Sequence, residues 1–277
     1  MDWRDEIIAA QDRIEGHVRR TPVAVLTLSG LADPCAVKLE QLQHTGSFKA
    51  RGAFNALLSA QVPARGVVAA SGGNHGAAVA FAAARLGIPA QIFVPEMAGA
   101  SKIALIRRFG AEMTVVPGAY ADAFMAAQAH EAATGADTVL IAVGGGGLGA
   151  GAIGWLQDRR RVVLVEPRTS CALHAALAAG APVDVEVSGV AANALGARRI
   201  GRICFDLARR FGARSVLVDD DAILQAQRVL WQEIRQLVEP AGATALAALL
   251  SGAYQPEAGE RVAVLVCGAN PAPDPLN

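Results

Sequence analysis

The sequence has no net charge, no long uninterrupted apolar run and no paired cysteines, and each absence excludes a class of protein. Its 25 lysines and arginines balance its 25 aspartates and glutamates, so no broad basic surface for nucleic acid is expected. Apolar runs are broken by glycine or charge, and the charged start MDWRDEIIAAQDRIEG is neither a secretion signal nor a membrane anchor. The four cysteines, Cys35, Cys171, Cys204 and Cys267, lack the spacing of a metal site. The sequence therefore predicts a cytoplasmic protein with a small-molecule partner.

Aromatic residues are also scarce, at 5%, whereas 53% of the residues are hydrophobic. A parallel sheet covered on both faces by Ala-rich helices has such a composition. Short β-branched runs alternate with helix-like stretches, which predicts βαβ units of an α/β protein. The predicted strands are GVVAAS, AQIFVP, EMTVVP, DTVLIAVG, RVVLVEP and RVAVLVCG, beginning at residues 66, 90, 112, 137, 161 and 261. Two domains are predicted, a discontinuous large one formed by 1–65 and 137–277 and a small one formed by 66–136.

The segment HTGSFKARGAFNAL places Lys49 and Arg51 near the beginning of a helix-like run. Cations are disfavoured at the positive N-terminal end of a helix, so a nearby anion would reconcile them with this position. Taken alone, the segment is more simply explained by a solvated lysine.

The turn AASGGNHGAAVA lies between a predicted strand and a predicted helix and contains Ser71, Gly72, Gly73, Asn74 and His75. Small residues let the backbone approach a ligand closely, and helix amides favour a carboxylate or a phosphate. A helix capped by Asn74 is the alternative interpretation.

The turn DTVLIAVGGGGLGAGA places four successive glycines, Gly144, Gly145, Gly146 and Gly147, between a strand and a helix. Their N–H groups would form an anion nest, and the helix dipole would add to it, so a phosphate monoester is the simplest ligand. A dinucleotide is the alternative, because G-x-G-x-x-G runs from residue 144 to 149 and Glu166 stands at the offset of a ribose-binding acid. That fingerprint, however, belongs to the first βαβ unit of a fold.

The late strand RVAVLVCGAN ends in Cys267, which by itself is most simply a small buried hydrophobe. Taken in order, SFKARGA, SGGNH, VGGGGL, VEP, EPAGA and CGAN, with the lead-in RTPV, resemble the fold-type II enzymes that use pyridoxal 5′-phosphate (PLP). The resemblance is to the serine/threonine dehydratase and serine racemase branch and covers nearly the whole chain. It implies two parallel-sheet α/β domains with the cofactor in the cleft between them.

The resemblance assigns the cofactor site. Lys49 would form the Schiff base with PLP and, once displaced by substrate, would take the Cα proton, a role that suits a desolvated lysine. Phe48 would lie against the cofactor ring, and Asn74 would hydrogen-bond the ring hydroxyl. Gly144–Gly147 with Leu148 would surround the phosphate.

The resemblance also assigns the substrate and the reaction. Ser71, Asn74 and His75 would hold the substrate carboxylate, and Cys267 would lie beside the pyridine nitrogen. A neutral thiol cannot protonate that nitrogen as a carboxylate could, which weakens the electron sink and favours prompt loss of a β-leaving group. Dehydration of L-serine or L-threonine to a 2-oxo acid and ammonia is therefore predicted.

Serine racemisation and loss of activity are the alternatives to this prediction. Racemase-like relatives have a serine proton donor at the position of Gly72, which has no side chain, so weak racemisation at most is expected. Some relatives bind a divalent cation through a glutamate at the position of Glu166 and a second acid six residues on, where this chain has Ala172. A complete metal site is therefore not expected, although Glu166 could contribute to a loose one.

The chain lacks one segment that its relatives usually carry, and the resemblance also implies a domain content and an oligomeric state. Relatives usually carry a further strand–loop–helix segment before the strand at Asp137, whereas here only Gly135 and Ala136 join that strand to the preceding helix-like stretch. Two residues make a very short connection between two domains, so the preferred explanation is that residues are missing from the sequence as given. If the protein itself lacks them, PLP would bind without efficient turnover. The end soon after CGAN implies a stand-alone catalytic unit, and the family habit implies a homodimer.

Overall fold

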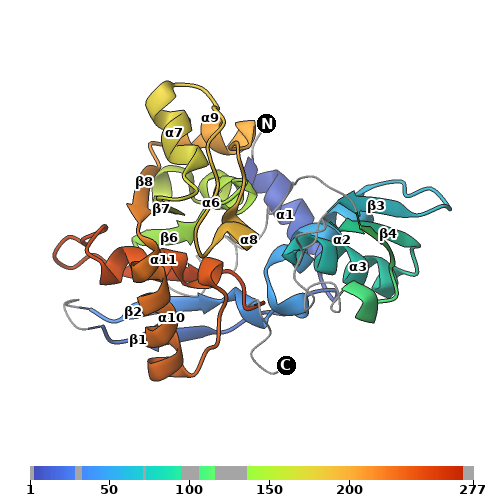
Figure 1. The fold of residues 1–277 in the computed structure, drawn as a ribbon, viewed down its shortest axis with the longest axis horizontal. Coiled ribbons are helices and arrows are strands. Elements are labelled where there is room, and N and C mark those ends of the chain that lie inside the picture. The colour runs from blue at the N-terminus through green and yellow to red at the C-terminus, as the bar shows by residue number, and fades with distance from the viewer. Residues whose placement is uncertain (1–2, 29–32, 71–72, 95–105, 116–135, 271–277) are drawn as a thin grey trace.

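The computed structural model describes residues 3–28, 33–70, 73–94, 106–115 and 136–270 (Figure 1). The described elements are, in chain order, α1 (Trp3–Ile14), β1 (Val23–Leu26), β2 (Cys35–Leu39), η1 (Glu40–Leu42), η2 (His44–Gly46), α2 (Lys49–Ser59), β3 (Val67–Ala70), α3 (Asn74–Leu86), β4 (Ala90–Val94), β5 (Glu112–Val115), β6 (Thr138–Ala142), α6 (Gly147–Leu156), η3 (Gln157–Arg159), β7 (Arg161–Pro167), α7 (Ala172–Ala179), α8 (Ala192–Leu195), α9 (Arg202–Arg210), β8 (Arg214–Val218), α10 (Asp220–Ile234), α11 (Pro240–Leu250) and β9 (Val262–Val266).

The larger sheet has six strands in the order β1-β2-β9-β6-β7-β8. All neighbours pair in parallel except β1, which pairs with β2 in the antiparallel sense at one edge. Every residue of the central strands β6 and β9 is buried, as expected for parallel strands covered on both faces. The carboxyl ends of these central strands lie at one edge of the sheet, where ligands of such folds bind.

The smaller sheet has three parallel strands in the order β3-β4-β5. In Figure 1 it lies with α2 and α3 on one side of the molecule, and the six-stranded sheet with α6, α10 and α11 lies on the other. The sheets have separate hydrophobic cores, one around β6, β7 and β9 and one around α1, α2 and α3. The boundaries near residues 65 and 137 stay a prediction.

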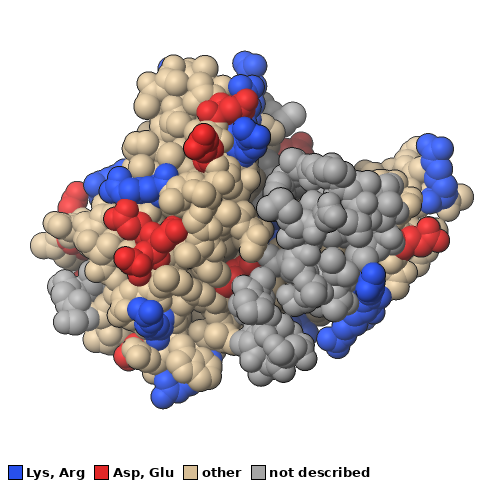
Figure 2. Space-filling model, viewed as in Figure 1, with Lys and Arg blue, Asp and Glu red and all other residues tan. Residues whose placement is uncertain are grey.

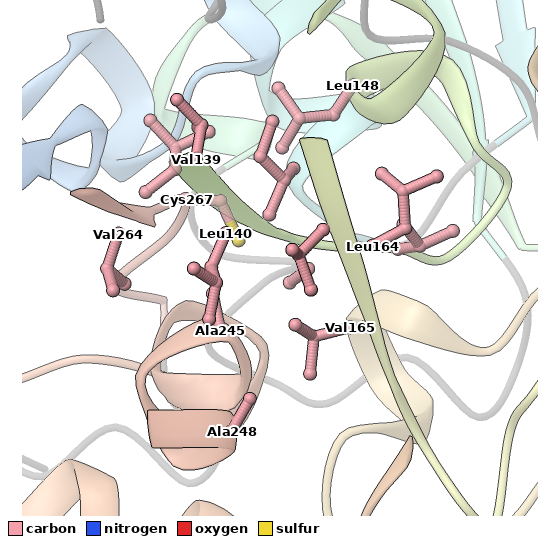
Figure 3. Close-up of a cluster of buried hydrophobic side chains, with 14 of the residues drawn as sticks. Val139, Leu140, Leu148, Leu164, Val165, Ala245, Ala248, Val264 and Cys267 are labelled. Carbon is pink, nitrogen blue, oxygen red and sulfur yellow. The ribbon is translucent and has the colours of Figure 1, made fainter. Parts of the chain in front are cut away.

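Helix α11 shows how an Ala-rich sequence packs on the larger sheet. Figure 3 shows Ala245 and Ala248 of this helix in one buried cluster with Leu140 of β6 and Val264 of β9. Small side chains let the helix approach the strands closely, and α11 thereby fixes the position of its own N-terminus near the carboxyl ends of β6 and β9.

The predicted α/β class with parallel sheets is confirmed, and all six predicted strands are present as β3, β4, β5, β6, β7 and β9. The sequence prediction missed β1, β2 and β8. On the face shown in Figure 2, lysine and arginine side chains are interspersed with aspartate and glutamate among uncharged residues. Within the described ranges, no helix combines the length and the apolarity needed to cross a membrane.

Candidate active site

Lys49 is held near the end of β9 by a short backbone pairing. Ser47 and Gly268 form an antiparallel bridge, the Phe48 N–H donates to the Cys267 carbonyl at 3.3 Å, and the Ala269 N–H donates to the Gly46 carbonyl at 2.9 Å. Since β2 and β9 are neighbours in the sheet, the chain leaving β2 is brought across the end of β9 just before α2 begins. Lys49, the first residue of α2, lies with Nζ 4.4 Å from the centre of the Phe48 ring.

The cation at the N-terminus of α2 has a protein anion as its partner. The guanidinium of Arg51 donates two hydrogen bonds to the fully buried Glu40 carboxylate, each 2.8 Å long. A third hydrogen bond runs from Arg51 to the Arg19 carbonyl at 3.0 Å. The nearby anion predicted from the sequence is therefore Glu40 for Arg51, and this bidentate pair anchors the first turn of the helix that carries Lys49.

The four glycines form the junction between β6 and α6, at the carboxyl edge of the sheet. Gly146 has φ +89° and precedes the first residue of α6, Gly147. A Cβ on Gly146 would lie 2.6 Å from the Cys204 Cβ, and one on Gly144 would lie 2.9 Å from the Leu195 Cα. Only glycine fits at these two positions, so the loop presents backbone instead of side chains. The first-turn amides of α6 have no intrahelical acceptor and favour an anion.

Asn74 reaches the same region from α3, beside the smaller sheet. Its Nδ2 donates to Glu239 Oε1 at 2.5 Å, and its Oδ1 accepts from Asn270 Nδ2 at 2.7 Å. Glu239 is 3% exposed and stands at the N-cap of α11. Three segments that are distant in the sequence therefore meet at one amide.

Cys267 lies directly after β9 and is buried. Its Sγ donates to the Ala241 carbonyl at 3.3 Å. Burial raises the pKa of the thiol to about 12, and the negative charge of Glu239 adds to that effect. The side chain is consequently a neutral thiol at physiological pH.

One cavity joins these groups, and the empty space between its walls is about 680 Å³, part of it open to solvent. Its lining includes every described residue that the sequence analysis assigned to the cofactor: Phe48, Lys49, Asn74, Gly144, Gly145, Gly146, Gly147, Leu148 and Cys267. His75, in the first turn of α3, is not part of this lining. Ser71 and Gly72 lie outside the described residues.

The lining fits a flat ligand that carries a phosphate and a carbonyl group. The glycine junction provides backbone N–H groups at a helix N-terminus for a phosphate, and Phe48 provides a ring face. Lys49 provides an amine for a carbonyl carbon. Much of the remaining wall is apolar, with Ala142, Val143, Leu195 and Ala197 among its residues, and the neutral Cys267 and the carboxylate of Glu239 also line the cavity.

Glu166, considered above for a ribose or a cation, has a different function. Its two carboxylate oxygens accept from the Leu173 and His174 N–H groups in the first turn of α7, both at 2.8 Å, and the side chain is fully buried. Burial raises its pKa to about 7, while the two backbone hydrogen bonds act in the opposite direction. The carboxylate therefore caps a helix and is not presented to a dinucleotide. Among the described residues, no three His, Cys, Asp or Glu side chains lie close enough to hold a metal ion.

The sequence analysis missed Glu239, Asn270 and the wall formed by residues 194–197. Glu239 and Asn270 belong to the EPAGA and CGAN segments, so their presence in a shared set of motifs was the available signal. No spacing rule indicated that their side chains would meet at Asn74.

Comparison with known proteins gives one family for the chain. The family described as "Pyridoxal-phosphate dependent enzyme" matches residues 14–136 and 125–268. Phenylserine dehydratase of Ralstonia pickettii is 35% identical over 95% of this chain and 92% of its own length. L-threonine ammonia-lyase of Thermotoga maritima is 31% identical over 96% of this chain and 75% of its own length. The chain spans about half, 54%, of the biosynthetic L-threonine dehydratase of Escherichia coli, to which it is 35% identical.

Solved structures agree with these sequence relatives. A threonine deaminase from T.th. superposes with a TM-score of 0.88 at 31% identity, covering 98% of this chain and 99% of that one. Maize serine racemase gives a TM-score of 0.87 at 27% identity, covering 96% and 93%. The chain belongs to the pyridoxal-phosphate dependent enzymes of fold type II, and its cofactor is PLP. The resemblance inferred from six motifs is thereby confirmed.

The alignments also locate a difference from the relatives. The alignment to phenylserine dehydratase is 299 positions long but covers 95% of a 277-residue chain, so this relative carries residues that the chain lacks. The family match is split in two, and the two parts overlap at 125–136, directly before β6.

Proposed function

We propose that the protein is a PLP-dependent dehydratase that removes water from a small β-hydroxy amino acid and releases a 2-oxo acid and ammonia. The observation that carries the proposal is the single cavity shared by Lys49, the glycine junction, Asn74 and a neutral Cys267. The names of the relatives, which include phenylserine dehydratase and L-threonine ammonia-lyase, support the same reaction class.

The residues present fit the cofactor. Gly144–Gly147 and Leu148 would hold its phosphate at the N-terminus of α6, Phe48 would pack on its ring, and Asn74 would donate to its ring hydroxyl. PLP supplies an electron sink for the pair left behind when the Cα–H bond of the substrate breaks.

Lys49 would carry the cofactor and then hold the proton of the reaction. Lys49 is the first residue of α2, and it lines the cavity. A neutral amine is the form that can take a proton from the substrate Cα, and the departing β-hydroxyl must also gain a proton to leave as water. The Arg51–Glu40 pair keeps this turn of the helix in place.

Cys267 would determine which reaction follows proton removal. A thiol that stays neutral would not protonate the ring nitrogen of PLP, so the cofactor would be a weaker electron sink. The electron pair from the Cα–H bond would then form the Cα=Cβ bond while the C–O bond to the β-hydroxyl breaks. Gly72 supplies no proton donor for the opposite face, which disfavours serine racemase activity. The resemblance implies that Ser71, Asn74 and His75 would hold the substrate carboxylate; of these three, Asn74 lines the cavity. Serine, threonine and a bulkier β-hydroxy amino acid such as phenylserine are the substrates to compare.

A labelling experiment on the cofactor lysine tests the proposal. The chain contains three lysines, Lys38, Lys49 and Lys102, so borohydride reduction of the PLP-loaded protein followed by peptide mapping identifies the labelled amine without ambiguity. We expect label on Lys49, and 2-oxo acid formation from L-serine, L-threonine or phenylserine that Lys49→Ala reduces by at least about 1,000-fold.

Lys102→Ala is the matched control and should keep both the label and the activity. If Lys49 is labelled but no 2-oxo acid forms, the protein binds PLP without dehydratase activity. If D-serine is the main product, the protein is a racemase. Label on either other lysine contradicts the proposed site.

We further propose a homodimer located in the cytoplasm. A sheet edge at β1 and several exposed apolar side chains, among them Val25, Trp231 and Leu237, are available for contact with a second copy. Light scattering during size-exclusion chromatography measures the assembly directly, and a monomeric mass would contradict the dimer.

A further inference from the structure

We propose that Glu239 and Asn270 are positioning residues for the cofactor, because together they fix the orientation of the Asn74 amide. The inference rests on the proposed function in taking Asn74 as the side chain that donates to the ring hydroxyl of PLP. Neither Glu239 nor Asn270 is proposed to make that donation itself.

The hydrogen bonds around Asn74 have a defined polarity. The Thr45 carbonyl can only accept, and it accepts from Asn270 Nδ2 at 2.8 Å. The same nitrogen of Asn270 donates to Asn74 Oδ1 at 2.7 Å. The nitrogen of Asn74 must therefore lie on the opposite side of the amide, where Glu239 Oε1 accepts from it at 2.5 Å. A backbone carbonyl at one end and a carboxylate oxygen at the other thus exclude the flipped amide.

This arrangement decides which atom of Asn74 faces an acceptor in the cavity. An amide nitrogen carries two hydrogens, and Glu239 takes one of them. The second N–H remains for the ring hydroxyl of the cofactor. If the amide were flipped, its carbonyl oxygen would take that place, and Asn74 could then only accept from the ring hydroxyl and could not donate to it.

Glu239 is well placed to be a fixed acceptor. It is 3% exposed, and it stands at the N-cap of α11, where its carbonyl accepts from the Gly242 N–H at 2.9 Å. Since α11 is packed against β6 and β9, the backbone that carries this carboxylate is held in place, and burial leaves the side chain little room to move. The backbone near Asn270 is likewise paired with the segment that carries Thr45 and Gly46.

Two glycines provide space for these side chains, which is an independent observation. A Cβ on Gly268 would lie 2.0 Å from Glu239 Oε1, and a Cβ on Gly46 would lie 2.5 Å from Asn270 Oδ1. Both glycines belong to the paired segments that place Lys49 beside Cys267. The backbone that positions the lysine therefore also makes room for the two residues that orient the amide.

The proposal predicts different PLP affinities for two substitutions at Glu239. Glu239→Gln keeps a carbonyl oxygen that can accept from Asn74, whereas Glu239→Ala removes the acceptor. We expect Glu239→Ala to raise the dissociation constant for PLP by about tenfold, the size of one lost hydrogen bond to a charged group. Glu239→Gln should stay within about threefold of the wild-type value.

The decisive measurement is a double-mutant cycle with Asn74→Ala, read by titration of the cofactor-free protein with PLP and by the absorbance maximum of the bound cofactor. If Glu239 acts through Asn74, then Glu239→Ala has less than about a twofold effect in the Asn74→Ala background. Glu233→Ala, an exposed acid on α10, is the control and should leave PLP affinity unchanged in both backgrounds.

Equal effects of Glu239→Ala in both backgrounds would overturn the proposal, as would a Gln variant as impaired as the Ala variant. If Glu239→Ala does not fold, Asn270→Asp tests the other end, because a carboxylate there cannot donate to Asn74 and should weaken PLP binding about tenfold. An unchanged affinity in that variant also overturns the proposal. The labelling of Lys49 and the 2-oxo acid assay on wild type report separately on the proposed function.

Discussion

At the scale of single residues, burial decides which ionisable groups near the cavity carry charge. Cys267 is kept neutral because burial raises the pKa of its thiol to about 12. Glu166 is also buried, and burial raises its pKa to about 7 although two helix amides favour its carboxylate form. The first residue is proposed to act in the reaction, whereas the second couples the stability of the fold to pH.

Glu166 leads to a prediction about pH. Its pKa is higher in the folded protein, about 7, than the ordinary value of 4.5, so the folded state holds the extra proton between these two values. The free energy of unfolding should therefore fall as pH rises from about 4.5 to about 7, by an amount on the order of 2 to 3 kcal/mol from this residue. Glu166→Gln should remove this part of the decrease in urea unfolding experiments at pH 5, 6 and 7.

Glu233→Gln is the control for that prediction, because Glu233 is exposed on α10. It should show the same decrease between pH 5 and 7 as the wild type. A Glu166→Gln variant with an unaltered pH dependence would mean that Glu166 is already ionised at pH 5.

At the scale of elements, the glycine junction between β6 and α6 contains positions where a residue with a side chain would be strained or would clash, so that only glycine fits. Gly146 combines φ +89° with close neighbours, whereas a Cβ on Gly145 would meet nothing nearer than the Ala197 Cβ at 3.9 Å. Two adjacent glycines in one motif therefore have different structural requirements, which the sequence alone does not distinguish.

This difference gives a matched pair of variants. Gly146→Ala should lower the free energy of unfolding of the cofactor-free protein by about 2 to 4 kcal/mol, because the new methyl group contacts Cys204 and Ile200 and the positive φ is strained. Gly145→Ala should cost less than about 1 kcal/mol. Chemical denaturation measures both, and equal losses would show that the junction does not have the conformation described.

The elements that the sequence failed to predict have a common physical reason. Strand β2 contains Lys38, which looks like a surface residue but is 1% exposed, with Nζ donating to the Thr21 carbonyl at 2.5 Å. Strand β8 begins with an exposed arginine and is only partly buried. Neither strand shows the continuous apolar run by which β6, β7 and β9 were predicted. Polar residues are tolerated in these strands because partners distant in the sequence, or solvent, satisfy them.

At the scale of the whole molecule, the cavity joins two parts of the chain that have separate cores. Asn74 comes from α3, which packs with the smaller sheet, whereas Lys49, Cys267 and the glycine junction lie at the edge of the larger one. A ligand that contacts both sets stabilises them together, since binding to the assembled site opposes any opening that separates them.

Hydrogen exchange tests this coupling. With PLP at about 100 times its dissociation constant, amides of α3 that exchange by opening of the site should be protected by up to about 100-fold. In Asn74→Ala, protection of α3 should be smaller at the same fractional saturation. Amides in α7 serve as the internal reference, because none of its residues lines the cavity. Saturated binding without added protection of α3 would contradict the coupling.

The sequence by itself indicated the family and the cofactor through six motifs that resemble those of known enzymes. It also predicted the anion-binding loop, because a strand, a glycine turn and a helix N-terminus are local features that a short sequence can specify. It also placed Lys49 and Cys267 at element ends. Only the tertiary structure decided that Glu40 partners Arg51, that Glu166 caps α7, and that Glu239 and Asn270 meet at Asn74. These contacts depend on how sheets and helices pack, and side chains separated by 165 and 196 residues have no spacing rule that relates them.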